Sequence, residues 1–263
     1  MTHIPRLVGM VHLSALPGSP RFGGDMDEVL HRAVEDAVAL EEAGFPALMV
    51  ENFGDAPFYP DRAPPETVAA MTVAVGAVGR ATGLTVGVNV LRNDALAALG
   101  IAAATGAAFI RVNVLVCTMY TDQGPITGRA AEVQRSRARL APEVEVWADV
   151  MVKHATAPSG TDPRLAALDT VERGLADAVI VSGSGTGAEL DIHEATVIRA
   201  AIPAETPLVV GSGAEAANLG RLLEVADAVI VGSSLKVDGA PHNPVDPDRA
   251  RQFVAAAREH GLA

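Results

Sequence analysis

Two titratable side chains lie at the ends of short apolar runs, and both are of types that can transfer protons. His12 closes the run 7–12 and Glu51 closes the run 47–51. Histidine ordinarily titrates near neutral pH and a carboxylate can act as a general base, so both are candidate catalytic residues. The alternatives are a histidine hydrogen-bonded within the rim of the fold and a Glu51 that pairs with Arg111.

Asp149 and Lys153 form a second candidate catalytic pair, in and just after the apolar run 145–152. The two-residue alternation of a strand predicts that they share one face. Lys153 then polarises a carbonyl, contacts a phosphate or, with a lowered pKa, forms a Schiff base. The alternative is that the two side chains only neutralise each other.

Glycine and hydroxyl residues follow the last three apolar runs, in a pattern typical of anion binding. Glycine lets the backbone approach an anion closely, and successive N–H groups can surround its oxygens. We therefore predict a phosphate site, against the alternatives of tight turns and a flexible surface loop. Its candidate residues are Ser182, Gly183, Thr186, Gly187, Gly211, Ser212, Gly213, Gly232, Ser233 and Ser234.

Several other polar residues are expected at the same end of the strands. Asn52 is placed to orient Glu51, and Asn89 and Asn113 suit hydroxyl groups of a sugar. Arg111 is costly to bury alone, so we expect a carboxylate or a ligand phosphate beside it. No metal-ligand spacing occurs and no cofactor is predicted; the alternative is a divalent ion held by His12, Glu51 and Asp149.

Eight β-branched apolar runs alternate with eight amphipathic segments along the chain, which predicts parallel β-α-β units. The first run lacks the glycine fingerprint of an open nucleotide-binding sheet, so we predict a single (β/α)8 TIM barrel over residues 1–263. The expected strands are 7–12, 47–51, 84–90, 109–114, 145–152, 178–182, 208–211 and 228–232. The expected helices are 25–43, 65–82, 94–105, 129–140, 163–174, 192–201, 214–225 and 247–260.

The amino-acid composition argues against some classes of binding partner. The formal net charge of −12 argues against nucleic acid and anionic lipid as partners. A single cysteine, Cys117, excludes an internal disulfide and fits a reducing compartment. No apolar run is long enough to span a bilayer, so we expect a cytoplasmic chain without membrane insertion. Homo-oligomerisation is expected only as a general tendency of such barrels.

These motifs resemble the BtpA/SgcQ family over almost the whole chain. The segments that carry the resemblance are Val8–Leu13, Leu16–Pro20, Glu51–Asp55, Pro57–Phe58, Gly87–Asp94, Phe109–Asn113, Thr121–Gly124, Val152–His154, Thr186–Gly187, Gly211–Gly213 and Ile230–Lys236. The resemblance implies a ribulose-phosphate-binding barrel. One branch of the family is named for photosystem I biogenesis and another is associated with sugar-utilisation genes. Cys117 departs from the small residue, such as glycine, that we would expect there.

Together, the residues and the resemblance lead us to expect an enzyme that acts on a phosphorylated sugar or nucleotide-like metabolite. Isomerisation, aldol-type cleavage and glycosidic-bond cleavage all suit the candidate groups. A non-catalytic assembly factor for a membrane protein complex is the main alternative, and a metabolite-binding regulator lies between the two.

Overall fold

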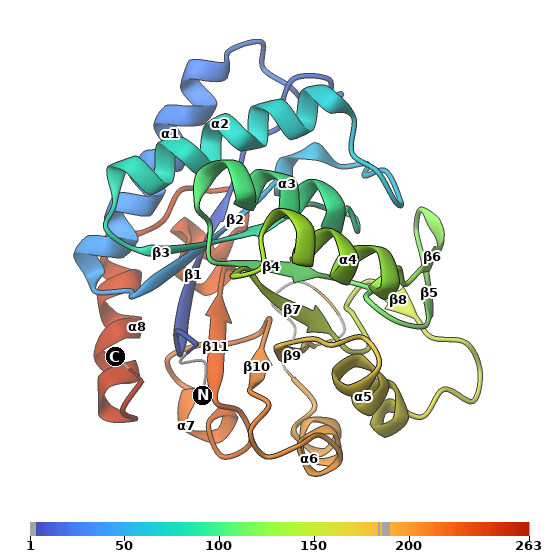
Figure 1. Ribbon diagram of the computed structural model, residues 1–263. Helices are drawn as coiled ribbons and strands as arrows, with labels where there is room; N and C mark the ends of the chain where they lie inside the picture. Colours follow the sequence, from blue (N-terminus) through green and yellow to red (C-terminus); the bar gives the residue numbers. More distant parts are fainter. Residues whose placement is uncertain (1–3, 184, 186–189, 263) are drawn as a thin grey trace.

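The computed structural model describes residues 4–183, 185 and 190–262. Eight parallel strands close into a barrel in the order β1-β11-β10-β9-β7-β4-β3-β2, which confirms the predicted fold (Figure 1). These strands are β1 (Leu7–His12), β2 (Ala47–Glu51), β3 (Thr85–Asn89), β4 (Phe109–Val112), β7 (Glu145–Asp149), β9 (Ala178–Val181), β10 (Leu208–Val210) and β11 (Ala228–Val231).

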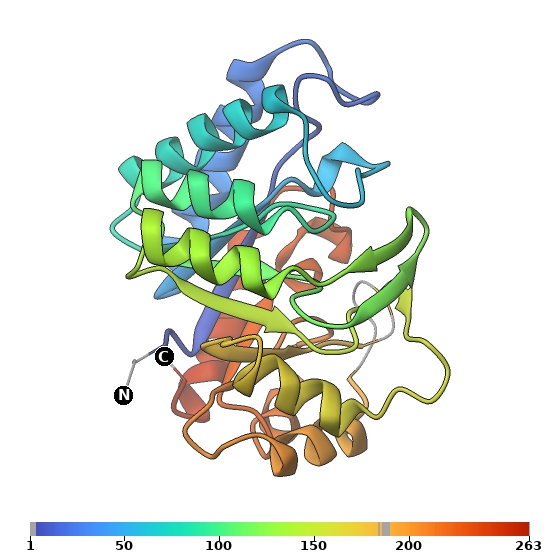
Figure 2. The ribbon, with the colours of Figure 1, turned by 45° about the vertical axis from the view of Figure 1, so that its right-hand side comes forward.

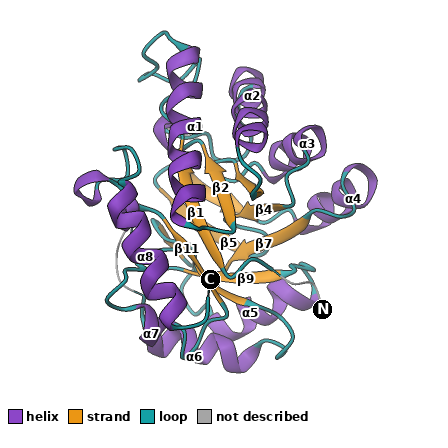
Figure 3. Cartoon of the chain, turned by 90° about the vertical axis from the view of Figure 1, so that its left-hand side faces the viewer, coloured by secondary structure: helices purple, strands orange, loops and turns teal. Residues whose placement is uncertain are grey.

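Helices surround the barrel and cover the outer faces of its strands (Figure 3). They are α1 (Met26–Ala43), α2 (Pro65–Ala81), α3 (Ala95–Thr105), α4 (Ala130–Leu140), α5 (Pro163–Glu172), α6 (Ile192–Ala201), α7 (Leu219–Leu222) and α8 (Pro247–Glu259). Local sequence sets their ends. The Asp25 carboxylate accepts hydrogen bonds from two backbone N–H groups at the start of α1, and Gly44 ends that helix with a φ of 102°.

Helix α7 is much shorter than the predicted segment 214–225. The side chain of Asn218 accepts a hydrogen bond from the Glu215 N–H at 2.9 Å and donates to the Gly213 carbonyl at 2.9 Å. Because an asparagine side chain competes in this way with the helical hydrogen bonds, the segment before Leu219 forms a turn. This turn borders the candidate site.

A small antiparallel sheet at the carboxyl end of the barrel was not predicted. It pairs β5 (Thr118–Thr121) with β6 (Gly124–Thr127) and with the short β8 (Ala155–Thr156). Figure 2 shows the β5–β6 hairpin projecting beyond the end of β4. Its strands are only four, four and two residues long, so they do not show the apolar runs by which the barrel strands were recognised.

The interior of the barrel is filled by the inward-facing half of each strand. The rings of Phe109 and Trp147 stack with their centroids 4.1 Å apart. Gly87 faces them from β3, and a Cβ added there would lie 2.2 Å from the Phe109 ring, so only glycine fits. Above this layer, the inward positions change from apolar to polar. In the described part of the chain, no helix is long and apolar enough to cross a membrane.

Candidate functional site at the carboxyl end of the barrel

Strand register brings four of the predicted site residues into one row. His12 pairs with Glu51, Glu51 with Asn89, and Asn89 with Arg111 across β1, β2, β3 and β4. His12, Glu51 and Arg111 follow inward-facing apolar residues at the two-residue spacing of a strand, and Asn89 follows Gly87, which faces Phe109. Their side chains therefore lie at the mouth of the barrel, where the last residues of parallel strands meet.

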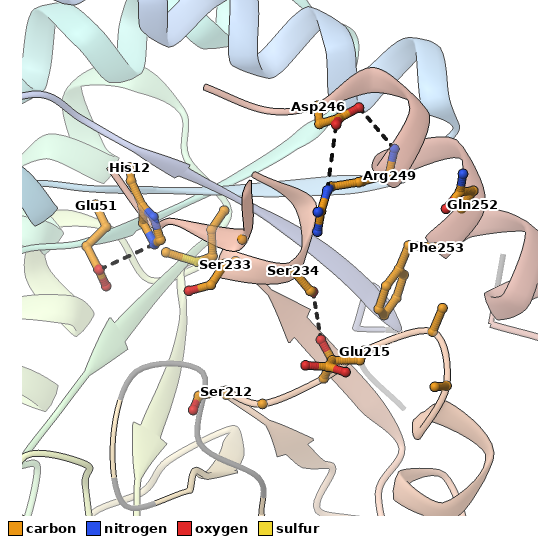
Figure 4. Close-up of a pocket in the computed structure, with 18 of the residues that line it drawn as sticks. His12, Glu51, Ser212, Glu215, Ser233, Ser234, Asp246, Arg249, Gln252 and Phe253 are labelled. Carbon is orange, nitrogen blue, oxygen red and sulfur yellow. Dashed lines mark hydrogen bonds and ion pairs between the residues drawn. The ribbon is translucent and has the colours of Figure 1, made fainter. Parts of the chain in front are cut away.

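A cavity of about 750 Å³ opens at this mouth (Figure 4). Ten predicted site residues line it: His12, Glu51, Arg111, Lys153, Gly211, Ser212, Gly213, Gly232, Ser233 and Ser234. The cavity thus joins the predicted proton-transfer residues of the first strands to the glycine loops after β10 and β11. Asn52, Asn89, Asn113, Asp149, Ser182 and Gly183 are absent from its lining.

His12 is held in one tautomer by its surroundings. Its Nδ1 lies 3.0 Å from the Pro241 carbonyl, which can only accept, so Nδ1 carries the proton and donates. The ring also stacks on Phe53, with centroids 4.5 Å apart. Burial, and then the positive charge of Lys236, lower the pKa of His12 well below 6.5. The neutral ring consequently presents an unprotonated Nε2 to the mouth, as a general base requires.

Glu51 is the acidic partner of this histidine. Its Oε1 lies 3.9 Å from His12 Nε2, and both side chains are largely buried. Burial raises the pKa of Glu51, although the positive charges of Lys153 and Arg111 oppose that rise. Burial and the neighbouring Arg111 charge also lower the pKa of Lys153. The cavity therefore holds a neutral imidazole base, a carboxyl group with a raised pKa and an amine with a lowered pKa.

Arg111 pairs with Asp149, and not with Glu51. Its Nε and Nη2 donate to the two carboxylate oxygens of Asp149 at 2.8 and 2.7 Å, in a pair closed to solvent. Asn113 donates to the same carboxylate at 3.2 Å. This arrangement corrects the predicted Asp149–Lys153 pair: β7 ends at Asp149, and Met151 follows with a φ of 54°, so strand alternation does not reach Lys153.

The three asparagines belong to the framework beneath the cavity. Asn52 donates to Asp55 at 3.0 Å and accepts from the Leu91 N–H at 2.7 Å, which turns its amide away from Glu51. Asn89 donates to the Arg111 carbonyl and to Asn113, each at 3.1 Å. Within the described residues, the buried Oδ1 of Asn89 has no partner.

The loops after β10 and β11 offer backbone donors to the cavity. Among the residues that the structure describes, no acceptor is found for the N–H groups of Ser212, Gly213, Ser233 and Ser234. Gly213 has a φ of 76°, a left-handed conformation that favours glycine. A Cβ added at Gly232 would lie 3.2 Å from the His12 ring. These loops can therefore surround an anion directly beside His12.

Gly211 has a packing role as well. A Cβ there would lie 2.5 Å from Ile180 and 2.8 Å from the Ser182 hydroxyl, so the close approach of β9 and β10 requires glycine. Ser182 and Gly183 line a neighbouring cavity of about 390 Å³, which shares Lys153 with the first. Thr186 and Gly187 lie outside the described residues.

Two loop residues have environments that sequence reasoning did not anticipate. Lys236 is fully buried and forms an ion pair with Asp36 of α1 at 2.6 Å. Cys117 is exposed and has a φ of 60°, which accounts for the expectation of a glycine at this position.

The far side of the cavity contains residues that sequence reasoning missed. Asp246, Asp248, Arg249, Gln252 and Phe253 line it from α8 and its N-cap. Figure 4 shows four of them: Asp246, Arg249, Gln252 and Phe253. They do not follow a strand directly, so the rule that located the other candidates did not apply to them. No group of histidine, cysteine and acidic side chains in the described ranges is arranged to hold a metal ion.

Comparisons with known proteins agree with this architecture. A sequence model of the BtpA family matches residues 4–259. An uncharacterised protein of Thermococcus kodakarensis is 51% identical over 96% of this chain and 95% of its own length. The photosystem I biogenesis protein BtpA of Synechocystis is 46% identical over 98% of this chain and 89% of its own length.

Solved structures of other proteins share the fold at low identity. N-(5'-phosphoribosyl)anthranilate isomerase from Pyrococcus furiosus superposes with a TM-score of 0.60 at 15% identity, covering 96% of this chain and 98% of its own. Thiamine phosphate pyrophosphorylase from the same organism gives 0.59 at 14% identity, covering 97% and 96%. Likeness at this level shows the barrel fold and nothing finer.

Proposed function

The chain belongs to the BtpA family, and we propose that it is an enzyme that transfers protons on a small phosphorylated sugar or nucleotide-like metabolite. The loops after β10 and β11 hold the phosphate in this proposal. His12 and Glu51 exchange the proton, and Lys153 polarises the group that receives the developing charge. Isomerase or lyase chemistry fits these roles best.

One observation carries the proposal: a single cavity contains both halves of the machinery. His12 and Glu51 line it on one side, and the backbone donors of Ser212, Gly213, Ser233 and Ser234 line it on the other. A phosphate bound by these donors fixes the rest of the ligand beside the His12 Nε2 atom. Such positioning converts binding energy at a remote group into catalysis at the reacting one.

The electrostatics of the mouth support proton transfer. A base works best when its pKa lies near the pH at which it acts, and so does an acid. Burial raises the pKa of Glu51 towards this range, and it keeps the His12 ring neutral, so that the ring can accept a proton. The Pro241 carbonyl keeps the His12 Nε2 lone pair available. The names of two structural neighbours, a phosphoribosyl isomerase and a thiamine phosphate enzyme, are compatible with a phosphorylated ligand.

Ligand-induced thermal stabilisation tests whether the loops after β10 and β11 bind a phosphate. Ribose 5-phosphate, glucose 6-phosphate and AMP are compared with ribose, glucose and adenosine. A compound present at ~100 times its Kd adds roughly 2.7 kcal/mol to the stability of the native state. We expect stabilisation by at least one phosphorylated compound and not by its parent. Gly232→Asp should abolish it, whereas Gly79→Asp, at an exposed site on α2 with no contact, should not.

Isotope exchange tests whether His12 and Glu51 transfer a proton to and from the bound compound. The stabilising compound is incubated with the protein in heavy water, and deuterium incorporation at carbon is measured by mass spectrometry. We expect exchange that falls by about 10²- to 10⁴-fold in His12→Gln and in Glu51→Gln. His193→Gln, an exposed histidine on α6, is the matched control. Binding without any exchange would indicate a metabolite-binding regulator instead.

A non-catalytic role in assembling a membrane protein complex is the second candidate. The name of the Synechocystis relative favours it, because that protein is 46% identical to this chain. Stabilisation of the chain by an isolated membrane complex, with no response to any phosphorylated compound, would support this role and refute the enzyme.

A further inference from the structure

The cavity does not end at the glycine loops. Beyond Ser234 it continues to the side chains of Arg249, Gln252 and Phe253 on α8. Figure 4 shows these side chains on one side of the Ser234 region and His12 with Glu51 on the other. We call the part around His12 and Glu51 the inner arm, and the part between α8 and residues 215–217 the outer arm.

The glycine loops after β10 and β11 lie where the two arms meet. The Ser234 hydroxyl donates to the Ala214 carbonyl at 2.8 Å and joins the two loops there. An anion held by the backbone N–H groups of Ser212, Gly213 and Ser233 then has open cavity on both sides. A total volume of about 750 Å³ lies in the upper part of the range for pockets that bury whole drug-sized ligands.

The charges of the outer arm limit what it can bind. Three carboxylates line it, those of Glu215, Asp246 and Asp248, against the single guanidinium of Arg249. Arg249 already lies 3.6 Å from Asp246. A second phosphate would meet net negative charge here, whereas carboxylates accept hydrogen bonds well from hydroxyl groups. The outer arm therefore suits an uncharged, hydroxylated group.

We propose that the ligand is a phosphodiester, with its reacting group in the inner arm, its phosphate at the glycine loops and a second, uncharged polyol or sugar in the outer arm. This inference rests on the proposed phosphate site and extends it. It assigns Gln252 and Arg249 to recognition of the second group, with the Glu215 carboxylate facing them across the arm. A phosphomonoester fills the inner arm and leaves the outer arm to water.

A matched pair of ligands tests the inference by calorimetric titration. Glycerol 3-phosphate and glycerophosphoinositol share the glycerol phosphate, and only the second carries an inositol on the other ester oxygen. The diester has one negative charge fewer, so an anion site alone would bind it more weakly. We expect it to bind at least about tenfold more tightly. Gln252→Trp should fill the outer arm and remove this advantage.

Ala255→Trp, on the exposed side of the same helix and outside the cavity, should keep the advantage of the diester. Equal or weaker binding of the diester would overturn the inference, and so would an advantage that survives Gln252→Trp. If glycerol 3-phosphate or ribose 5-phosphate binds while the diester does not, the proposed phosphate site stands and only the outer arm is refuted. Failure of every phosphorylated compound refutes both.

Discussion

Arg111 and Asp149 form a bidentate ion pair inside the barrel, with Nε–Oδ2 and Nη2–Oδ1 distances of 2.8 and 2.7 Å. The pair links β4 to β7 and lies beneath Lys153 and Glu51 in the site. Its geometry uses both carboxylate oxygens, which favours a structural role for Asp149 over proton transfer. The positive charge of Arg111 still acts on the site, because it lowers the pKa of Lys153 and opposes the rise at Glu51.

Removing one partner should therefore destabilise the barrel strongly. Asp149→Ala leaves the Arg111 guanidinium buried without a carboxylate, and we expect a loss of about 3–5 kcal/mol in the free energy of unfolding. Urea denaturation measures it. Arg251→Ala breaks an ion pair whose side chains are 54% and 79% exposed, and should change stability by no more than about 0.5 kcal/mol. A loss below about 1 kcal/mol for Asp149→Ala would mean that Arg111 reaches another partner.

Stability should depend on pH through Glu51. Burial raises its pKa in the folded state above the ordinary 4.5, so the native protein holds this proton more tightly than the unfolded chain. The resulting stability is fully present below pH 4.5 and is lost as the pH rises through the folded pKa. Glu51→Gln should remove that loss, so its gain in stability relative to the wild type should be larger at pH 8 than at pH 4.5. A gain independent of pH would refute the shifted pKa.

His12 should make the stability of the protein depend on pH in the opposite direction. Burial lowers its folded pKa below 6.5, so the unfolded chain takes up this proton first. Stability is then complete above pH 6.5 and is lost as the pH falls towards the lowered folded pKa. His12→Gln should reduce the loss measured by urea denaturation between pH 7 and pH 5. His193→Gln should leave it unchanged, since that side chain is exposed. An identical acid loss in wild type and His12→Gln would contradict the assignment.

The barrel and the row of inward residues could be predicted because they depend on local patterns. Alternation along a strand decides which side chains face inward, and it placed His12 and Glu51 correctly at the mouth. Partners across strands depend on the stagger of the closed barrel, which no single strand encodes. Sequence reasoning therefore expected Lys153 beside Asp149, where the structure has Arg111.

Contacts made by loops and helix faces were also beyond sequence reasoning. The Pro241 carbonyl that orients His12 comes from 229 residues further along the chain, in a segment without regular structure. Arg249 and Gln252 reach the cavity because of how α8 packs on the barrel. Such contacts follow from the assembled fold and leave no periodic signal in the sequence.

The glycine at position 87 should be irreplaceable while Phe109 is present. Gly87→Ala places a methyl group 2.2 Å from the Phe109 ring inside a filled barrel, and we expect a loss of about 1–3 kcal/mol or more. Phe109→Leu should relieve the clash, giving a favourable coupling of about 0.5–3 kcal/mol in a double-mutant cycle. Gly79→Ala, exposed on α2, should instead stabilise by about 0.5–1 kcal/mol. Simple additivity of the two barrel substitutions would refute the packing explanation.

The buried pair of Lys236 and Asp36 should control the tautomer of His12 from a distance. Asp36 accepts from Lys236 and from the Val245 N–H, each at 2.6 Å, so α1 anchors both ends of the segment that carries the Pro241 carbonyl. Replacing both charges, in Lys236→Met with Asp36→Leu, avoids leaving one charge buried alone. The segment should then hold the Pro241 carbonyl less firmly. The proton of the neutral His12 ring should no longer be confined to Nδ1.

Nitrogen NMR of protein labelled at histidine distinguishes this positioning role from a general loss of stability. We expect one neutral tautomer of His12 in the wild type, protonated at Nδ1, and a mixture of the two in the double variant, measured well below its unfolding temperature. Asp238→Asn, an exposed substitution in the same segment, should retain the single tautomer. If the double variant unfolds more easily but keeps Nδ1 fully protonated, the ion pair contributes only stability. If its tautomers mix, the buried ion pair on α1 orients the base through the Pro241 carbonyl.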